Sequence, residues 1–339
     1  MPSSFNTASR LVLITLGFMI AYATPVFAER PYVVGYMPAY KDIRATADAT
    51  DMTKLTHINI SFFNPDADGQ FMRNGEPACM DGASVNDLDY VVRNAHKAGA
   101  KVLVAIAGGV IPPCGGDWSH LLKPAQRQAV IDQLVQFVED HQLDGIDVDI
   151  EGALLTKIDE EGNYTPFVAQ LRSALNGKLL TAATATYDGG MIPVSSLPYF
   201  DFVTLMSYDA IGPSWGPAGA EHSSYAVAEE HVATWRERGL PADKLVLGLP
   251  FYGYGFGKYA AEYYTFDDLI SQFGTTIAQG DLIGEACAGC DYITYNGIQT
   301  LQKKVALGLR EGAGVMIWEM SQDTQGELNL LNVVHQAIE

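Results

Sequence analysis

Residues 143–152 read LDGIDVDIEG, a β-strand pattern that carries a row of acids. Branched aliphatic residues alternate with Asp147, Asp149 and Glu151, so the three acids point to one side of a strand and the aliphatic side chains to the other. Like charges in such a row repel one another, and burial penalises each ionised form. We therefore interpret the row as an active site that holds or moves protons.

The acid row has two alternative interpretations. Residues 147–152 resemble the start of a calcium loop, but the twelfth position is Ile158, where such a loop needs a bidentate glutamate. A solvated acidic face is the second alternative. Val148 and Ile150 suit a buried strand better than either. We predict a catalytic strand without a metal or cofactor.

The first 28 residues resemble a signal peptide, with an apolar core over residues 11–22 and small residues before Glu29. An uncleaved membrane anchor is the alternative, because Arg10 is the only basic residue before the apolar core. The core is short for a membrane span. We expect a secreted protein, extracellular or periplasmic, that makes no membrane contact once the signal is removed.

The remaining 311 residues (339 minus 28) match the length of one α/β barrel. A formal charge of −19 argues against a nucleic-acid partner, because phosphate binding needs clustered Lys and Arg. A neutral substrate fits better, and we expect a monomer with a single catalytic domain at residues 29–339.

Eight strand-like runs alternate with helix-like runs, which predicts a (β/α)8 TIM barrel. Gly and Pro in the connection between the fifth and sixth strands predict a turn in place of a helix. The longest connection, residues 256–311 between strands 7 and 8, predicts a small insertion that forms one wall of a cleft. The strands are expected at residues 32–36, 56–63, 102–107, 145–151, 179–186, 202–208, 245–249 and 315–318.

Four cysteines in an exported chain allow up to two disulfides in three possible pairings. Cys79 and Cys114 follow the second and third predicted strands, at the same end of the barrel, so we pair them. Cys287 and Cys290 form a CxxC motif, for which a local disulfide is favoured over a zinc site that would need two further ligands.

Barrel active sites lie at the C-terminal ends of the strands, so Glu151, the last acid of the row, is nearest the substrate. Asp149 lies about 6.6 Å behind it on the same face, at a rise of about 3.3 Å per residue. A two-carboxylate glycosidase needs a nucleophile or base on the opposite face of the sugar from its acid. For glycoside hydrolysis, the nucleophile must therefore come from another strand or from the substrate.

Asp144, Asp147, Asp149 and Glu151 form a D-x-x-D-x-D-x-E motif, which resembles that of glycoside hydrolase family 18, the chitinases and related endo-β-N-acetylglucosaminidases. Residues 206–209 resemble the family's M-x-Y-D, and the two motifs together are highly specific. The resemblance covers essentially the whole chain after residue 28 and indicates a bacterial-type chitinase. Other matching segments are Gly35-Tyr36, residues 59–62, residues 248–254 and residues 315–318.

The resemblance implies substrate-assisted retaining hydrolysis, in which the 2-acetamido oxygen attacks C1 and forms an oxazolinium intermediate. Glu151 would be the general acid and then the base. Asp149 would hold the acetamido N–H, and Asp147 would share a proton with Asp149. Tyr208 would hydrogen-bond the acetamido oxygen. Asp144 has the opposite strand parity and is expected to face away and serve structure.

The resemblance also implies a set of substrate-binding residues. Trp318 would form the floor of the cleaved-sugar subsite, with Tyr36 and Phe62 in the same pocket and Met206 and Asp209 beside the sugar. The alternative for an aromatic residue on a barrel strand is core packing, and the alternative for Asp209 is a loop cap.

Three further residues have both a functional and a structural interpretation. Trp118 and Trp215 follow the third and sixth strands in loops that contain Gly and Pro, where we expect exposed sugar-stacking residues. Local packing is the alternative for both. His222 is equally well explained as a structural hydrogen-bond partner.

The third strand departs from the family pattern. The family's S-x-G-G appears here as Ala105, Ile106, Ala107, Gly108 and Gly109, so the Ser is absent and the alignment is ambiguous by one residue. The Ser is not the proton donor. We therefore expect activity to survive with altered tuning of Asp147.

Three functions remain open on the sequence. The first is a chitinase that cleaves β-1,4-linked N-acetylglucosamine chains, and the second is an endo-β-N-acetylglucosaminidase acting on N-glycan cores. The third is a catalytically silent, chitin-binding barrel. Silent relatives usually lose the acid, whereas Glu151 is present, so the sequence favours an enzyme.

Overall fold

The computed structural model describes residues 1, 30–261 and 263–339. Apart from Met1, the predicted signal peptide lies outside the described residues. Pro31–Glu339 form one compact unit.

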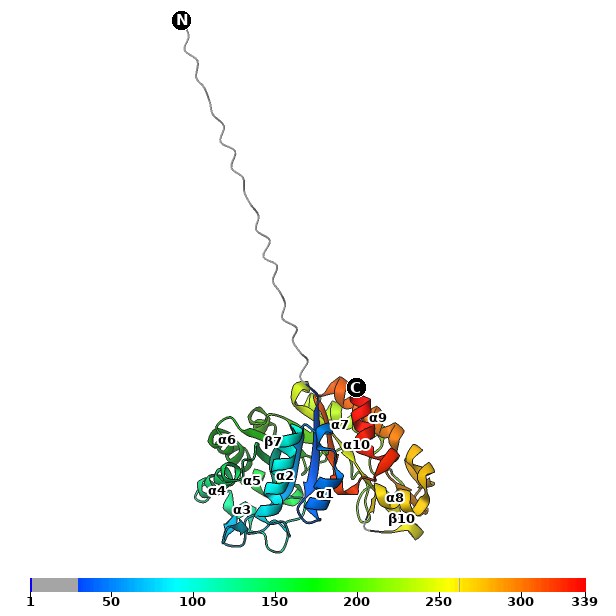
Figure 1. The fold of residues 1–339 in the computed structure, drawn as a ribbon, viewed down its shortest axis with the longest axis horizontal. Coiled ribbons are helices and arrows are strands. Elements are labelled where there is room, and N and C mark those ends of the chain that lie inside the picture. The colour runs from blue at the N-terminus through cyan, green and yellow to red at the C-terminus, as the bar shows by residue number, and fades with distance from the viewer. Residues whose placement is uncertain (2–29, 262) are drawn as a thin grey trace. The chain divides into compact units, whose positions relative to one another are not determined.

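Eight parallel strands close into a barrel within this unit, in the order β1-β14-β9-β8-β7-β6-β5-β2. The first strand pairs with the last, and the blue and red ends of the described chain lie side by side in Figure 1. The predicted TIM-barrel fold is confirmed. The strands are β1 (Tyr32–Pro38), β2 (His57–Phe63), β5 (Lys101–Gly108), β6 (Gly145–Ile150), β7 (Leu179–Thr184), β8 (Val203–Leu205), β9 (Leu245–Pro250) and β14 (Gly314–Trp318).

Helices lie between successive barrel strands, except between β7 and β8. Ser84 and Asp87 form a capping box at the start of α2, and Gly99 ends that helix with a left-handed backbone (φ 84°). A 3-10 turn, Val194–Tyr199, replaces a helix between β7 and β8, as predicted. No helix of the described residues is long and apolar enough to cross a membrane. The helices are α1 (Ile43–Ala49), α2 (Val85–Ala98), α3 (Trp118–Leu121), α4 (Arg127–Asp140), α5 (Gly152–Glu160), α6 (Tyr164–Ala174), α7 (Tyr225–Glu237), α8 (Phe266–Phe273), α9 (Ile298–Glu311) and α10 (Leu330–Ile338).

Strand parity separates two buried layers. Ile146, Val148 and Ile150 of β6 pack in the core between the barrel and the helices. A second cluster, which includes Tyr36 and Tyr208, fills the inside of the barrel. The acids alternate with the outer residues of β6, so their side chains point into the barrel.

A four-stranded antiparallel sheet lies between β9 and α9, in the order β11-β10-β13-β12. It contains β10 (Tyr252–Phe256), β11 (Tyr264–Thr265), β12 (Leu282–Gly284) and β13 (Tyr292–Thr294), together with α8. The sheet begins at Tyr252, within the segment of residues 248–254, and α9 packs against β9 and β14 as a barrel helix. The sheet is thus an insertion between the seventh and eighth barrel strands, as the sequence predicts.

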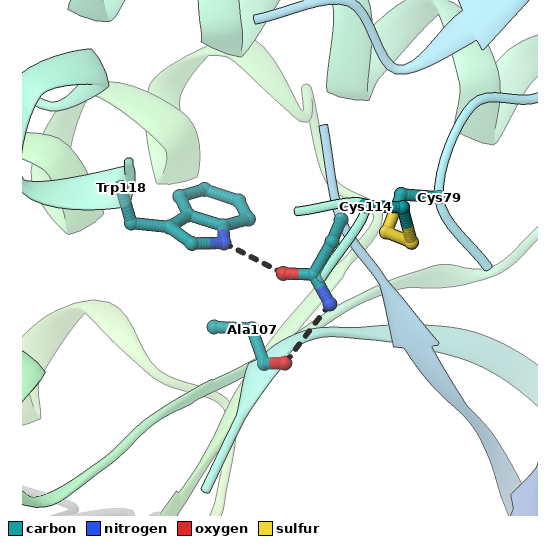
Figure 2. Close-up of a disulfide and its surroundings, with 5 residues drawn as sticks. Cys79, Ala107, Cys114 and Trp118 are labelled. Atoms are coloured by element: carbon teal, nitrogen blue, oxygen red, sulfur yellow. Dashed lines mark hydrogen bonds between the residues drawn. A yellow bond between two sulfur atoms is a disulfide. The ribbon is translucent and has the colours of Figure 1, made fainter. Parts of the chain in front are cut away.

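The structure contains two disulfides, Cys79–Cys114 and Cys287–Cys290, with the predicted pairings. The first joins the loops after β2 and β5 at one barrel end (Figure 2). The second closes a tight loop between β12 and β13 in the inserted sheet.

Candidate active site

The acid row lies at the C-terminal end of β6. Asp147 and Asp149 are buried inside the barrel, and Glu151 is the first residue after the strand, partly exposed at the floor of a cleft. Glu151 lines two adjacent cavities, whereas Asp149 lines one of them. Strand alternation therefore places the acids in order of depth, with Glu151 nearest solvent.

Two hydroxyl groups hold Asp147 from opposite sides. The Tyr36 hydroxyl donates to its Oδ2 at 2.6 Å, and Thr181 Oγ1 donates to its Oδ1 at 2.5 Å. Burial raises the pKa of Asp147 to about 6, and these hydrogen bonds oppose the rise because they favour the ionised form. Asp147 can therefore exchange a proton near neutral pH.

Asp149 and Glu151 form a carboxyl pair with raised pKa values. Burial, followed by the charges of Glu151 and Asp147, raises the pKa of Asp149 well above its ordinary value. Burial and the charge of Asp209 raise the pKa of Glu151 to about 7, and a hydrogen bond with Asp149 opposes this rise. Among the described residues, Oδ1 of Asp149 has no hydrogen-bond partner. The carboxyl pair can thus hold a proton near neutral pH, and Oδ1 of Asp149 is available as a hydrogen-bond acceptor.

The cleft extends to both sides of Glu151. One cavity of about 590 Å³ and another of about 490 Å³ share Glu151, Met206, Tyr208 and Asp209 in their walls. The larger one has Ala185, Thr186, Tyr187, Ala210, Trp215 and His231 as its other lining residues. The smaller one is also lined by Tyr40, Phe62, Asn64, Asp81, Gly109, Val110, Pro112, Pro113, Asp149 and Trp318.

Three aromatic residues gather at the smaller cavity. The ring of Trp318 stacks with that of Phe62 (centroids 5.8 Å apart, planes at 24°) and meets that of Tyr36 at 5.3 Å. Trp318 and Phe62 are partly exposed and line the cavity. Tyr36 is buried and contacts Asp147 instead, so it lies beneath the cavity rather than in its wall.

The segment after β8 brings Met206, Tyr208 and Asp209 to the cleft, where we expected substrate-binding residues. Asp209 has a left-handed backbone (φ 63°), and its carboxylate accepts a hydrogen bond from the Tyr252 hydroxyl of the inserted sheet. His222 is fully buried, with Nδ1 3.9 Å from the Asp209 carboxylate. Neither ring nitrogen of His222 has a hydrogen-bond partner among the described residues, so its burial indicates packing and not the expected hydrogen bond.

The register of β5 resolves the ambiguous third-strand motif. Ala105 pairs with Asp147 and packs inside the barrel, whereas Ile106 packs in the outer core. Ala105 therefore occupies the position that faces Asp147, and it has no hydroxyl to donate. Thr181 of β7 supplies that hydrogen bond from the neighbouring strand on the other side.

Gly108 and Gly109 lie close to the side chains of Phe62 and Glu151. A Cβ at Gly108 would lie 2.7 Å from the Phe62 ring, and one at Gly109 would lie 3.0 Å from Oε1 of Glu151. Close approach and a φ of 93° thus favour glycine at position 108, whereas a side chain at position 109 would require the Glu151 carboxyl to shift slightly.

We expect Gly109→Ala to lower kcat on the order of 10-fold, because the new methyl group displaces the Glu151 carboxyl by tenths of an ångström. The melting temperature is expected to change little. Steady-state kinetics beside thermal unfolding checks this, with Gly109→Ala in a Glu151→Gln background as control. An unchanged kcat would show that the carboxyl has room to move.

Trp118 differs from its expected role as an exposed sugar-stacking residue. It is fully buried, and its Nε1 donates to Oδ1 of Asn64 at 2.7 Å, while Asn64 Nδ2 donates to the Ala107 carbonyl at 3.1 Å (Figure 2). The side chain thus braces the ends of β2 and β5 near the disulfide. Trp215 is 46% exposed and lines the larger cavity, as expected.

Sequence reasoning missed three exposed large hydrophobic residues of the cleft, Tyr40, Val110 and Tyr187. Each follows the C-terminal end of a barrel strand, and that position was the available signal. Asp144, by contrast, lies below the site as expected. Its carboxylate accepts from the Val102 backbone N–H at 2.7 Å.

Comparison with known proteins agrees with this geometry. The family model for glycosyl hydrolases family 18 matches residues 32–323. The crystal structure of the chitinase ChiB from the chitin utilization locus of Flavobacterium johnsoniae is 37% identical, with a TM-score of 0.78 over 92% of this chain and 94% of that chain. A Bacteroides thetaiotaomicron chitinase is 26% identical, with a TM-score of 0.78 over 91% of this chain and 96% of the other.

Curated relatives include further proteins with chitinase names. A class V chitinase of Arabidopsis thaliana is 27% identical over 68% of this chain and 71% of its own length. A chitinase-like effector of Moniliophthora roreri is 24% identical, and the match spans 64% of that protein. The motifs, the barrel and these matches together show that the chain belongs to glycoside hydrolase family 18 and is a glycoside hydrolase of this chitinase family.

Proposed function

We propose that the protein is a secreted chitinase that hydrolyses β-1,4-linked N-acetylglucosamine chains with retention of configuration. The observation that carries this proposal is the carboxyl pair of Asp149 and Glu151 on one strand at the cleft floor. Both acids approach a sugar from one side. The nucleophile for the other side is then the 2-acetamido group of the substrate itself.

In the first step, Glu151 donates its proton to the glycosidic oxygen while the acetamido oxygen attacks C1 and the C1–O bond breaks. A pKa of about 7 keeps Glu151 mostly protonated in an acidic medium and about half protonated at pH 7, as a general acid requires. In the second step, the Glu151 carboxylate takes a proton from water, the water oxygen bonds to C1, and the oxazolinium ring opens.

Asp149 stabilises the positive charge of the intermediate. Its Oδ1 lacks a partner among the described residues and is available to accept the acetamido N–H, which orients the acetamido oxygen toward C1. Asp147 lies deeper and exchanges a proton with Asp149. Tyr208, in the wall of both cavities, donates to the acetamido oxygen, and Trp318 supports the sugar ring.

The cleft on both sides of Glu151 favours an oligosaccharide or chitin as substrate. Trp318 and Phe62 provide apolar surface on one side, and Tyr187 and Trp215 provide it on the other. A chain that crosses the cleft can thus contact aromatic residues before and after the cleaved bond. Solved neighbours bind NAG4 and (GlcNAc)3, at identities of 19% that show the shared fold alone.

The experiment that tests the proposal is product release from N-acetylchitooligosaccharides, run beside an N-glycopeptide. Cleavage of the oligosaccharide supports a chitinase. Cleavage of the glycopeptide alone would assign the protein to the N-glycan core enzymes. Sugar binding without cleavage of either would favour the catalytically silent barrel.

The alkaline limb of the pH profile depends on Asp209. Its negative charge raises the pKa of Glu151, so Asp209→Asn lowers that pKa and the acid loses its proton at a lower pH. We expect the alkaline limb of kcat/KM, near pH 7 in the wild type, to move to lower pH. Asn retains an acceptor for Tyr252. An alkaline limb that does not move would show that the charge of Asp209 does not act on the general acid.

A further inference from the structure

Lys304 of α9 is a fully buried lysine outside the cleft. Its ammonium group donates to three neutral acceptors, the Ser223 carbonyl (2.6 Å), Ser223 Oγ (2.6 Å) and Asn296 Oδ1 (2.8 Å). Asn296 Nδ2 in turn donates to the same Ser223 carbonyl at 2.7 Å. Three separate hydrogen bonds therefore converge on the backbone and side chain of one residue, Ser223.

Burying this ammonium group is costly. The acceptors of its three hydrogen bonds are all neutral, and burial lowers its pKa to about 7. The carboxylates whose charges act on Lys304 are Asp281 and Glu221, and the charge of Lys304 in turn acts on His222 and His231. A methionine would fill a similar volume without this cost. A lysine at this buried position is explained if its hydrogen bonds hold a backbone segment that packing alone does not hold in place.

Ser223 connects Lys304 to the cleft. Its Oγ accepts from Lys304 and donates to the Ser207 carbonyl at 2.7 Å. Strand β8 ends at Leu205, and one more backbone bond to β7 follows it, from the Met206 N–H to the Thr184 carbonyl at 2.9 Å. Ser207 lies between Met206 and Tyr208, which both line the cleft. The hydrogen-bond chain from Lys304 thus holds the Ser207 carbonyl just beyond the point where the bonds between β7 and β8 end.

We propose that Lys304 is a positioning residue that acts through Ser223 on the Ser207 carbonyl and thereby holds Met206 and Tyr208 in place at the cleft. The effect on turnover rests on the proposed function, because Tyr208 acts on the acetamido group there. The effect on the segment itself does not depend on any substrate.

Hydrogen exchange tests the positional part directly. In Lys304→Met and in Ser223→Ala, we expect the backbone amides of residues 206–210 to exchange about 10-fold faster, which corresponds to one lost buried hydrogen bond. The matched control is Thr300→Val on the same helix, which removes a buried hydrogen bond to Asp281 but leaves the chain from Lys304 to Ser207 intact. Exchange in residues 206–210 that rises equally in all three variants, or in none, would overturn the proposal.

Steady-state kinetics tests the expected effect of Lys304 and Ser223 on turnover. Lys304→Met and Ser223→Ala are each expected to lower kcat about 10-fold on an N-acetylchitooligosaccharide with a smaller change in KM, and the double variant is expected to match either single variant. Multiplied effects in the double variant would mean independent roles and contradict the proposal. If Lys304→Met does not fold, Ser223→Ala against Thr300→Val decides. A wild type inactive on every sugar would reject the proposed function, while hydrogen exchange would still decide the positioning role.

Discussion

Glu151→Gln is expected to reduce kcat on N-acetylchitooligosaccharides by about 10³-fold, because it removes the carboxyl group that the proposed mechanism uses to protonate the glycosidic oxygen. The amide keeps the size of the side chain and its place beside Gly109. We therefore expect KM and oligosaccharide affinity to stay within a few-fold of the wild type. Initial rates and isothermal titration calorimetry measure the two quantities separately.

The stability of the same variant provides a control. Burial raises the pKa of Glu151, which means that the folded protein disfavours its ionised form. This group therefore contributes stability at acidic pH, and the contribution is lost as the pH rises through about 7. Glu151→Gln is expected to reduce the loss of thermal stability over that pH range. A variant that is inactive because it is unfolded would show no cooperative thermal transition.

Asp149→Asn is expected to lower kcat by about 10²-fold, and Asp149→Ala by about 10³-fold, because both remove the negative charge that stabilises the oxazolinium ion. Asn retains an acceptor for the acetamido N–H, whereas Ala does not. The ratio between the two variants therefore separates orientation from electrostatic stabilisation. Single-turnover kinetics on an N-acetylchitooligosaccharide measures the chemical step for both.

Asp144→Asn is the matched control for Asp149. It removes a carboxylate from the same segment, three positions before Asp147 and on the opposite side of the backbone. We expect its kcat to stay near the wild type, with lower stability from the weakened bond to the Val102 N–H. Equal losses in the Asp144 and Asp149 variants would contradict the assigned roles.

The barrel was predictable from the sequence because strand parity and helix caps are local signals. The alternation around Asp147, Asp149 and Glu151 identified which side chains enter the barrel. The sixth strand was predicted too long, at residues 202–208, because Met206–Asp209 continue its composition. The structure places only Val203–Leu205 in the strand, and Ser223 donates to the Ser207 carbonyl beyond it, a partner that no local pattern indicates.

Loop residues were harder to assign than strand residues. Trp118 and Trp215 occupy similar loops in the sequence, yet one is buried against Asn64 and the other is exposed in the cleft. The difference depends on which distant side chains surround each loop. Thr181 likewise contacts Asp147 through strand order in the closed barrel, which the missing third-strand hydroxyl alone did not predict.

The configuration of the first product formed distinguishes substrate-assisted hydrolysis from direct attack by water. The full chain is mixed with N-acetylchitohexaose in a proton NMR tube, and the anomeric signals of the new reducing ends are followed before mutarotation. Attack by the acetamido oxygen and then by water inverts C1 twice, so we expect the β-anomer first. Initial release of the α-anomer would mean a single displacement by water and would rule out the acetamido group as nucleophile.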